Sequence, residues 1–377
     1  MQNKIWLSPP HMSGNELSYI EDALQKNWVT SQGENIDGFE KSLSVFLKDN
    51  VKVCALHSAT SAIHLALLMF GVSLNDEVLT STFSFCASAN PITYCGATPL
   101  FIDSEKETWN MCPIALEKAI QDRISKGKRP KAIIVVHLYG MPAKMDEITA
   151  VAEKYEISVI EDAAEALGST YKGQACGTFG RFGILSFNGN KIITTSGGGA
   201  LVCHTQEDKD QAVFLSTQAR DNAPHYQHSH IGYNYRMSNI VAGIGRGQME
   251  VLNERVEARR KMHDFYVDVF KDIEGVEVFS EPNEDYYSNH WLSAIVIDEK
   301  IARKNREDLR LAFLEDNIES RPLWKPMHLQ PVFADAPYYG TNVAEKLFDD
   351  GLCLPSGSNL SDDDRLRIEN VIKEFFW

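Results

Sequence analysis

A single lysine stands in an unusual setting, in the stretch SFNGNKIITTSGGGALV at residues 186–202. Lys191 lies between two short apolar runs and is followed by small hydroxyl residues and a triple glycine. A lysine in such a strand-like, glycine-rich segment could form a Schiff base with an aldehyde if its surroundings partly suppress its charge. The simpler interpretation is a surface lysine in a hairpin, which is the commoner use of this residue.

Two neighbouring acids stand within a second apolar run, ISVIEDAAEALG at residues 157–168. Side chains alternate along a strand, so Glu161 and Asp162 should face opposite sides of a sheet, and one of them should point toward a ligand. A carboxylate in that place could keep the pyridine nitrogen of pyridoxal phosphate (PLP) protonated, so that the ring acts as an electron sink. The alternative is an acid that caps a helix.

Two further stretches could complete a site for such a cofactor. HSATSAIHLAL at residues 57–67 opens a helix with small hydroxyl residues, and the free N–H groups of a helix start bind phosphate. Phe83 and Phe85, in TFSFCASAN at residues 82–90, follow a predicted strand, where an aromatic ring could stack on a flat cofactor. Each stretch also has an ordinary interpretation, as a helix cap in the first case and as core packing in the second.

The whole chain has 377 residues and a net charge of −15, from 37 basic and 52 acidic residues. Its length favours two domains. The acidic balance argues against binding of nucleic acid or of an anionic membrane, although a few local groups could still bind a small anion. Seven cysteines without a C-x-x-C motif indicate reduced thiols in a cytoplasmic protein. The first residues lack the apolar core of a signal peptide, and no segment has the length of a transmembrane helix.

The order of predicted elements indicates an α/β fold with a mostly parallel sheet. Ligands of such a sheet lie beyond the carboxyl ends of its strands, where Asp162 and Lys191 follow apolar runs. One long helix over residues 237–270 is predicted to lead from a large domain (1–245) into a smaller C-terminal domain (246–377). Predicted helices cover residues 15–26, 60–70 and 145–156, and predicted strands cover 77–81, 99–103 and 131–140.

Together these segments resemble the DegT/StrS-type PLP-dependent sugar-nucleotide aminotransferases, and the resemblance covers nearly the whole chain. It implies the aspartate aminotransferase fold (PLP fold type I), with a large domain around a mostly parallel sheet and a smaller C-terminal α+β domain. The segments SPPHMSGNEL and NGNKIITTSGGG are similar in particular to enzymes that aminate C4 of a UDP-4-keto-6-deoxy-N-acetylhexosamine, on the route to bacillosamine-type sugars. The other matching segments are SATSAIHLAL, EDAAEALGSTYKG, GTFGRFGILSFNGNKIITTSGGG, GYNYRMSN, RPLWKPMH and CLPSGSNLSDDD.

The resemblance implies roles for individual residues. Lys191 is expected to bind the cofactor covalently and later to move a proton to the sugar carbon, Asp162 to pair with the pyridine nitrogen, and Phe85 to stack on the ring. Glu165 is expected near the cofactor hydroxyl, although family members more often have glutamine there, and histidine in place of Leu167. The residues expected at the phosphate are Thr60, Ser61, Ser186 and Asn234, the last from the partner subunit, with Arg236 as an alternative. The candidates for contact with the nucleotide sugar are Arg236, Arg321, Trp324 and His328.

By the same resemblance, the protein is expected to be a cytoplasmic homodimer. It would move an amino group from glutamate to C4 of the UDP-linked sugar, for a bacterial surface glycan or glycoprotein. Three alternatives are amination at C3 of a dTDP-keto sugar, a sugar dehydratase, and a catalytically inert protein that senses a nucleotide sugar. Lys191 argues against the dehydratase, whose relatives have histidine at that place. An inert protein would be free to lose Lys191 or Asp162, and both are present.

The segment HYQHSH places His225, His228 and His230 close together. Their spacing lacks a second group of ligands nearby, so a loop near the dimer interface is expected in preference to a metal site. The run GIGRGQ at residues 243–248 follows no predicted strand and lies within a helical pattern. It is therefore not expected to bind a dinucleotide.

Overall fold

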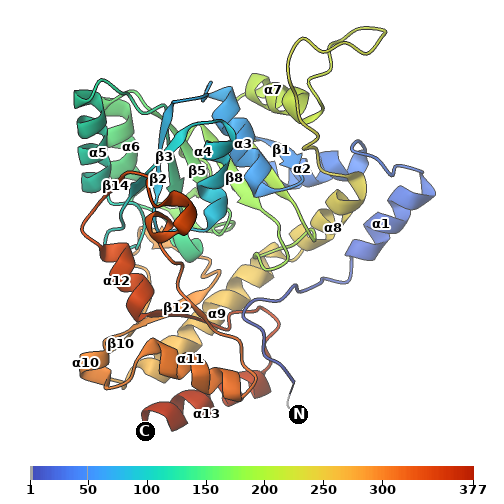
Figure 1. Cartoon of the computed structure of the whole chain (residues 1–377). Coiled ribbons are helices and arrows are strands. Elements are labelled where there is room, and N and C mark those ends of the chain that lie inside the picture. Colours follow the sequence, from blue (N-terminus) through green and yellow to red (C-terminus); the bar gives the residue numbers. More distant parts are fainter. Residues whose placement is uncertain (1–2, 49) are drawn as a thin grey trace.

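A central sheet of eight strands forms the large domain of the computed structural model, which describes residues 3–48 and 50–377. Its strands are β1 (Lys52–Leu56), β2 (Glu77–Ser81), β3 (Thr98–Ile102), β4 (Ala132–Val136), β5 (Ser158–Asp162), β8 (Phe182–Ser186), β9 (Gly199–Cys203) and β14 (Tyr338–Tyr339). They lie in the order β1-β9-β8-β5-β4-β2-β3-β14 (Figure 1). β9 is antiparallel to both of its neighbours, and every other adjacent pair is parallel. The predicted mostly parallel α/β sheet is confirmed.

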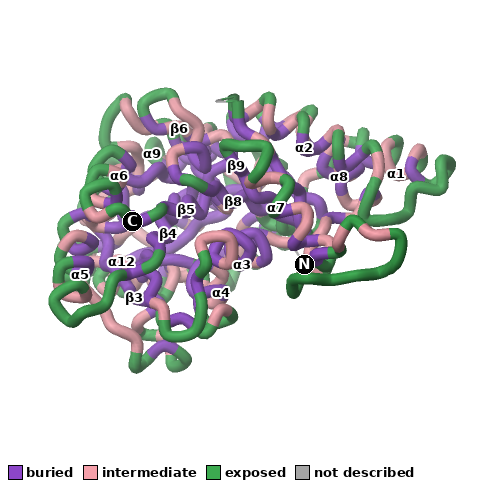
Figure 2. The backbone as a smooth tube through the Cα atoms, turned by 90° about the horizontal axis from the view of Figure 1, so that it is seen from above, coloured by how far each residue is buried: buried purple, intermediate pink, exposed green. Residues whose placement is uncertain are grey.

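Helices cover both faces of this sheet, and within its middle strands β8, β5 and β4 only Ser158, at the start of β5, is exposed. Those of the large domain are α1 (Glu16–Gln25), α2 (Glu34–Leu47), α3 (Ala59–Met69), α4 (Asn90–Tyr94), α5 (Pro113–Ser125), α6 (Met145–Lys154), α7 (Gln206–Ser216) and α8 (Asn239–Met249). In β4, Ile134 packs in the core beneath α3 and α7, while Ile133 packs in the core beneath α5 and α6. Figure 2 shows the strands as a buried centre with exposed segments around it. A strand covered on both faces needs apolar residues at every position, which explains the uninterrupted AIIVV run of β4.

The smaller domain is built on a second, antiparallel sheet. Its strands are β10 (Val276–Val278), β12 (Ser293–Ile297), β13 (Arg321–Pro322) and β15 (Gly351–Leu354), in the order β10-β12-β15-β13. Its helices are α9 (Leu252–Phe270), α10 (Glu299–Ala302), α11 (Arg306–Glu315), α12 (Val343–Asp350) and α13 (Asp362–Phe376). Tyr266, Phe313 and Ile368 are fully buried in the core between this sheet and its helices. A third sheet consists of β6 (Thr170–Tyr171), β7 (Gln174–Ala175) and β11 (Tyr286–Tyr287).

The single long helix predicted for residues 237–270 was wrong, because the structure has two helices there, α8 and α9. α8 packs through its glycines against α1 and α2: a Cβ on Gly245 would lie 2.7 Å from the Phe39 ring. α9 instead packs in the smaller domain, through residues such as Met262. The chain leaves the helical conformation at Val251, with φ −115° and ψ 9°, so that each helix can meet its own partners.

Two segments cross the expected division at residue 245. β14 belongs to the C-terminal part of the chain, yet it pairs with β3 in the large sheet. In the other direction, Ile5 forms a β-bridge with Ile318 and is buried in the core of the smaller domain. The N-terminal segment and β14 therefore each tie the two domains together.

The composition predicted reduced cysteines and no transmembrane helix. All seven cysteines are free thiols. Burial raises the pKa of the Cys54 thiol to about 11, because the charged thiolate is disfavoured away from water. None of the helices within the described residues combines the length and the apolar composition needed to cross a membrane.

Candidate active site

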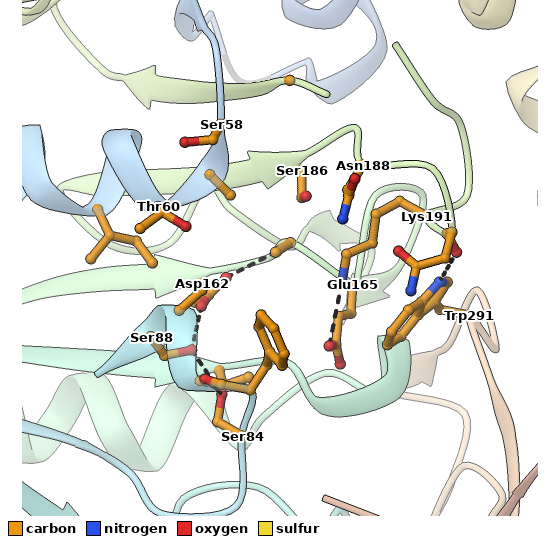
Figure 3. Close-up of a pocket in the computed structure, with 18 of the residues that line it drawn as sticks. Ser58, Thr60, Ser84, Ser88, Asp162, Glu165, Ser186, Asn188, Lys191 and Trp291 are labelled. Atoms are coloured by element: carbon orange, nitrogen blue, oxygen red, sulfur yellow. Dashed lines mark hydrogen bonds and ion pairs between the residues drawn. The ribbon is translucent and has the colours of Figure 1, made fainter. Parts of the chain in front are cut away.

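The residues with candidate chemistry meet at the carboxyl-end edge of the large sheet. β1 leads there into α3, β2 into the segment of Phe85, β5 ends at Asp162, and β8 leads into the loop of Lys191. β9 runs antiparallel to its neighbours, so it begins at this edge of the sheet. The glycines at its start therefore lie at the same edge. All of these segments contribute to the lining of one pocket (Figure 3).

Lys191 is not a surface lysine. Its side chain is only 13% exposed, and its Nζ lies 3.5 Å from Glu165 Oε1. The same Nζ lies 3.9 Å from the centroid of the Trp291 ring, over its face. A carboxylate and an aromatic face both attract an ammonium group, so together they hold the amine at one place in the pocket.

Glu165 follows β5 and is buried beside the amine. Its Oε2 accepts a 2.7 Å hydrogen bond from the backbone N–H of Tyr139, a residue held in the left-handed region with φ 53°. Burial raises the pKa of Glu165, and the Lys191 ammonium and the Tyr139 N–H oppose that rise. The glutamate that departs from the commoner family pattern is thus the direct partner of Lys191.

Asp162 occupies the end of β5, and its side chain lines the pocket beside Ser88 of the short 3-10 helix Cys86–Ser88. It is 5% exposed, and its Oδ2 accepts a 2.6 Å hydrogen bond from the hydroxyl of Ser88. Its Oδ1 accepts a weaker bond from the N–H of Ala164, at 3.2 Å. Among the described residues, no lysine, arginine or histidine forms an ion pair with this carboxylate. A buried carboxylate without a cationic partner is costly unless a bound group supplies the positive charge.

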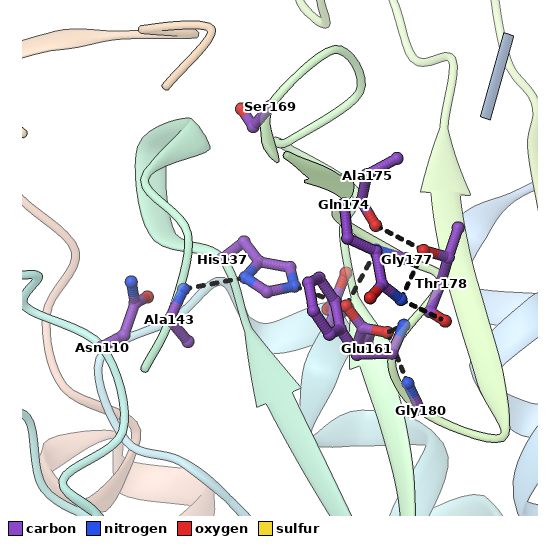
Figure 4. Close-up of polar contacts among 12 residues, drawn as sticks. Asn110, His137, Ala143, Glu161, Ser169, Gln174, Ala175, Gly177, Thr178 and Gly180 are labelled. Carbon is purple, nitrogen blue, oxygen red and sulfur yellow. Dashed lines mark hydrogen bonds and ion pairs between the residues drawn. The ribbon is translucent and has the colours of Figure 1, made fainter. Parts of the chain in front are cut away.

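Glu161 lies on the opposite face of β5, as the alternation predicted, and its contacts are structural (Figure 4). His137 Nδ1 accepts the N–H of Ala143 at 3.0 Å, so Nε2 carries the proton that is donated to Glu161 at 2.9 Å. Glu161 also accepts the N–H groups of Gly177 and Gly180. The acid therefore fixes the turn that leads into β8, away from the pocket.

The start of α3 forms one wall of the pocket and has the features of an anion site. Ser58 caps the helix by accepting the N–H of Ser61 at 3.1 Å. The remaining N–H groups of the first turn have no acceptor within the helix, and Figure 3 shows the Thr60 and Ser186 hydroxyls facing the same space. A Cβ on Gly199 would lie 2.3 Å from the Ala59 nitrogen, so only glycine lets β9 begin this close to the helix.

Ser61, in contrast, does not line the pocket. Its hydroxyl donates to the carbonyl of Ser58 at 2.8 Å, and the residue is 4% exposed. The structure thus separates two neighbours that the sequence treated alike. Thr60 faces the pocket, and Ser61 stabilises the first turn of the helix.

Two aromatic side chains border the opening of the pocket. Phe85 is 50% exposed, and its ring centroid lies 5.4 Å from that of Trp324. Both residues line the pocket, whereas Phe83 is buried in the core. The exposed face of Phe85 is available for stacking on a flat ring.

The sequence did not single out Trp291, which packs directly against the lysine. Trp291 precedes β12, is 1% exposed, and donates from Nε1 to the carbonyl of Asn190 at 2.6 Å. An aromatic residue before a strand is common in cores, so no local signal distinguishes this one. The sequence also did not single out Ser88, in the CASAN segment, as the hydrogen-bond partner of Asp162.

Two predicted site residues are engaged elsewhere. The guanidinium of Arg236 is paired with Glu40 at 2.5 Å and also donates to the carbonyl of Ala55. His328 is held by the Thr82 hydroxyl at 2.7 Å, with its other ring nitrogen 3.3 Å from a glutamate of α12. Neither residue lines the pocket, so both are left out of the site proposed below.

Neither Arg321 nor Asn234 lines this pocket. Arg321 lines a neighbouring cavity, and Asn234 lies on the surface. A second cavity adjoins the first and shares Trp291 and Trp324 with it, and Arg321 is among its lining residues. The Arg321 side chain is 67% exposed and pairs with Glu319 at 2.8 Å. Asn234 is exposed and bridges to Thr217, away from the pocket of its own chain.

His225, His228 and His230 lie in an exposed loop that follows α7 and stands out from the body of the molecule (Figure 1). His228 donates from Nδ1 to the carbonyl of Gln218 at 2.9 Å. The ring of His230 packs edge-on against Phe214 at 5.8 Å. The loop carries these rings into solvent, where they do not converge on one another.

The side chains and backbone groups that line the pocket fit PLP. The α3 start and the hydroxyls of Thr60 and Ser186 suit a phosphate, and the Asp162 carboxylate, which has no cationic partner among the described residues, suits a protonated pyridine nitrogen. Phe85 offers an aromatic face, and the Lys191 amine suits the aldehyde. Figure 3 shows Asp162 and Lys191 at opposite sides of the pocket, where one flat molecule could reach both.

Over nearly its whole length the chain is similar to known aminotransferases. The model of the DegT/DnrJ/EryC1/StrS aminotransferase family matches residues 10–374. The "Putative pyridoxal phosphate-dependent aminotransferase EpsN" of Bacillus subtilis (strain 168) is 49% identical, over 100% of this chain and 97% of its own length. GDP-perosamine synthase of Escherichia coli O157:H7 is 36% identical, over 97% of each chain. The solved structure "Putative sugar aminotransferase Spr1654 from Streptococcus pneumoniae, PLP-form" is 26% identical with a TM-score of 0.89, over 100% of both chains.

Proposed function

Because the chain belongs to the DegT/DnrJ/EryC1/StrS aminotransferase family, we propose a specific reaction for it: transfer of an amino group from glutamate to C4 of a UDP-linked 4-keto-6-deoxy-N-acetylhexosamine. That the chain is a PLP-dependent sugar aminotransferase follows from the family. The observation that carries the proposal is the Lys191 amine between Glu165 and Trp291, in a pocket that shares Trp291 with an adjoining second cavity. The C4 assignment rests on the SPPHMSGNEL and NGNKIITTSGGG segments. The product would serve synthesis of a bacterial surface glycan or glycoprotein in the cytoplasm.

The residues of the large domain bind and orient the cofactor in this proposal. When bound, PLP supplies the electron sink that lets an amino group pass between an amino acid and a ketone. Asp162, held by Ser88, keeps the proton on the pyridine nitrogen. Thr60, Ser186 and the α3 start hold the phosphate, and Phe85 covers one face of the ring.

Lys191 is the group that moves the proton. Lys191 is the only lysine or arginine among the described residues that line the pocket, so its amine can take a proton from the donor amino acid and deliver one to C4 of the sugar. Glu165 and Trp291 keep the amine aimed into the pocket between these steps. Glu165, which also lines the pocket, would contact the hydroxyl of the bound cofactor.

Product analysis tests the substrate assignment. The purified protein would be supplied with glutamate and a panel of UDP- and dTDP-linked keto sugars, and the products identified by mass spectrometry and NMR. A 4-amino-6-deoxy-N-acetylhexosamine linked to UDP is the expected product. A 3-amino product from a dTDP sugar would replace the assignment with C3 amination, and no amination of any sugar would support an inert nucleotide-sugar sensor.

Arg321 should act in only one half of the reaction. A nucleotide sugar carries a diphosphate that needs positive groups, and in this acidic chain Arg321 supplies one in the adjoining cavity. Arg321→Ala is expected to slow the sugar-nucleotide half-reaction about tenfold and to change the glutamate half-reaction little. The two half-reactions can be measured separately by the absorbance of the cofactor.

A matched control is Arg365→Ala, which removes a partly exposed arginine from an ion pair, the one with Asp362 on α13. This variant should leave both half-reactions unchanged. Equal losses in both half-reactions of Arg321→Ala would show that Arg321 has a structural role and does not meet the diphosphate.

The homodimer should complete each active site with a residue from the other subunit. Asn234 is exposed and lies outside its own pocket, while Tyr226 and Ile231 of the neighbouring loop are 80% and 85% exposed. Lys191→Ala and Asn234→Ala should each be inactive as pure dimers. After mixing and subunit exchange, about a quarter of wild-type activity should return, because half of the dimers then contain one intact site.

Light scattering should give the mass of two chains for the wild-type protein. An active monomer would contradict the dimer. A dimer without recovery on mixing, once subunit exchange is shown by differently tagged copies, would place Asn234 in the site of its own chain or outside any site.

A further inference from the structure

Arg259 of α9 is a buried cation without an acidic partner. It is 1% exposed, and among the described residues no carboxylate forms an ion pair with it. Burial, together with the nearby Arg255, lowers its pKa to about 9, so the guanidinium is still charged at neutral pH. An unpaired buried charge is expensive, so it is retained where its hydrogen bonds matter.

All the acceptors of Arg259 lie around the Lys191 loop. Its Nη1 donates to the carbonyl of Trp291, and its Nη2 donates to the Ser8 hydroxyl at 2.9 Å and, more weakly, to the carbonyl of Lys191 at 3.4 Å. Ser8 in turn donates to the carbonyl of Asn190 at 2.7 Å. The indole N–H of Trp291 donates to the same carbonyl at 2.6 Å.

These bonds close a network around one peptide segment. The N-terminal segment, the lysine loop and the segment before β12 are distant in sequence, and Arg259 touches all three. The Trp291 ring that it helps to fix is the one that lies 3.9 Å from the Lys191 amine, and Figure 3 shows the two side chains next to each other. A planar guanidinium presents five donors in a fixed fork, which suits several carbonyls at once.

We propose that Arg259 is a positioning residue for Lys191, which holds the lysine loop and the Trp291 ring in the arrangement that aims the amine into the pocket. The inference rests on the proposed role of Lys191 as the cofactor lysine. Carbonyl dipoles and the Ser8 hydroxyl, in place of a carboxylate, compensate the charge. The lysine therefore keeps its place without a second acid that would compete with Glu165 for its ammonium.

The variants Arg259→Gln and Arg259→Lys test this, with Arg255→Gln as the matched control. Arg255 lies one turn earlier on α9, is also buried, and donates to the carbonyl of Met12 at 3.2 Å, but makes no hydrogen bond with the lysine loop. Both Gln variants remove a buried arginine from the same helix. A merely structural role would therefore affect them alike.

Two readouts report on the lysine itself. In the apo protein, acetic anhydride would label lysines, and mass spectrometry would give the rate at Lys191 relative to Lys144, whose side chain is similarly shielded at 18% exposed. In the holo protein, visible circular dichroism would report how the cofactor is held. Arg259→Gln should raise the relative labelling rate of Lys191 about tenfold and reduce the visible signal at least about twofold, Arg259→Lys should have smaller effects, and Arg255→Gln should change neither.

Equal changes in Arg259→Gln and Arg255→Gln, or no change in either, would overturn the proposal. If Arg259→Gln does not fold, Ser8→Ala replaces it, because it removes the bridge between Arg259 and Asn190 and must raise the labelling of Lys191 in the same way. Borohydride reduction of the wild-type holo protein separates the two hypotheses. A cofactor fixed on another lysine would refute the role of Lys191, while the apo labelling would still decide whether Arg259 positions it.

Discussion

Sodium borohydride is expected to fix the cofactor on Lys191, and Lys191→Ala is expected to lower turnover about 10⁴-fold. The amine is the covalent attachment point and also the group that moves the proton, so its loss removes two functions at once. Its side chain is 13% exposed and aimed at the pocket by Glu165 and Trp291. Peptide mapping after reduction would identify the modified lysine, and absorbance would follow the bound cofactor.

Lys144→Ala is the control for this experiment. Lys144 is also shielded and paired with acids, Glu105 and Glu107, but lies outside the pocket. Its loss should leave the site of reduction and the turnover unchanged. Reduction that modifies any lysine other than Lys191 would show that the attachment point is assigned wrongly.

Asp162→Asn should keep the cofactor bound and slow the proton-transfer step about 10²- to 10³-fold. Asparagine preserves the shape and the contact with Ser88, so the pocket should remain formed. It removes the charge that holds the proton on the pyridine nitrogen, which weakens the ring as an electron sink. Rapid-mixing absorbance with glutamate would measure the step. Asp162→Ala is a less clean variant, because it also leaves the ring nitrogen without a partner.

The neighbouring acid provides a matched comparison. Glu161→Gln removes a charge one residue away, on the other face of β5, where Glu161 accepts bonds from His137 and the turn of Gly177 and Gly180. This variant should lose about 1–3 kcal/mol of stability in thermal or denaturant unfolding, with the proton-transfer step little changed. If Asp162→Asn transfers protons at the wild-type rate, Asp162 has no part in the mechanism.

The sequence by itself determined the kinds of elements and their order. Apolar periodicity reports what a segment buries, and the AIIVV run of β4 is apolar throughout because helices cover both of its faces. Strand alternation is equally local, so the opposite orientations of Glu161 and Asp162 followed from the sequence alone. The clustering of the candidate residues at one edge followed from the parallel order of the strands.

The tertiary structure alone decided which candidates reach the pocket. The turn of α3 sends Thr60 into the pocket and ties Ser61 to Ser58, although the two are neighbours in a run of similar residues. Arg236 forms an ion pair with Glu40, 196 positions away in the chain, and so does not reach the pocket. α8 and α9 separate because each packs against a different domain.

The surroundings of Lys191 were also decided only by the folded chain. Trp291 and Arg259 meet the lysine loop from 101 and 68 positions away. A local pattern shows that a tryptophan or a helix face will be buried, but the identity of the segment that buries it depends on how distant elements pack. The glycine-rich segment around Lys191 therefore predicts the role of this lysine. The direction in which its amine points is set by residues outside that segment.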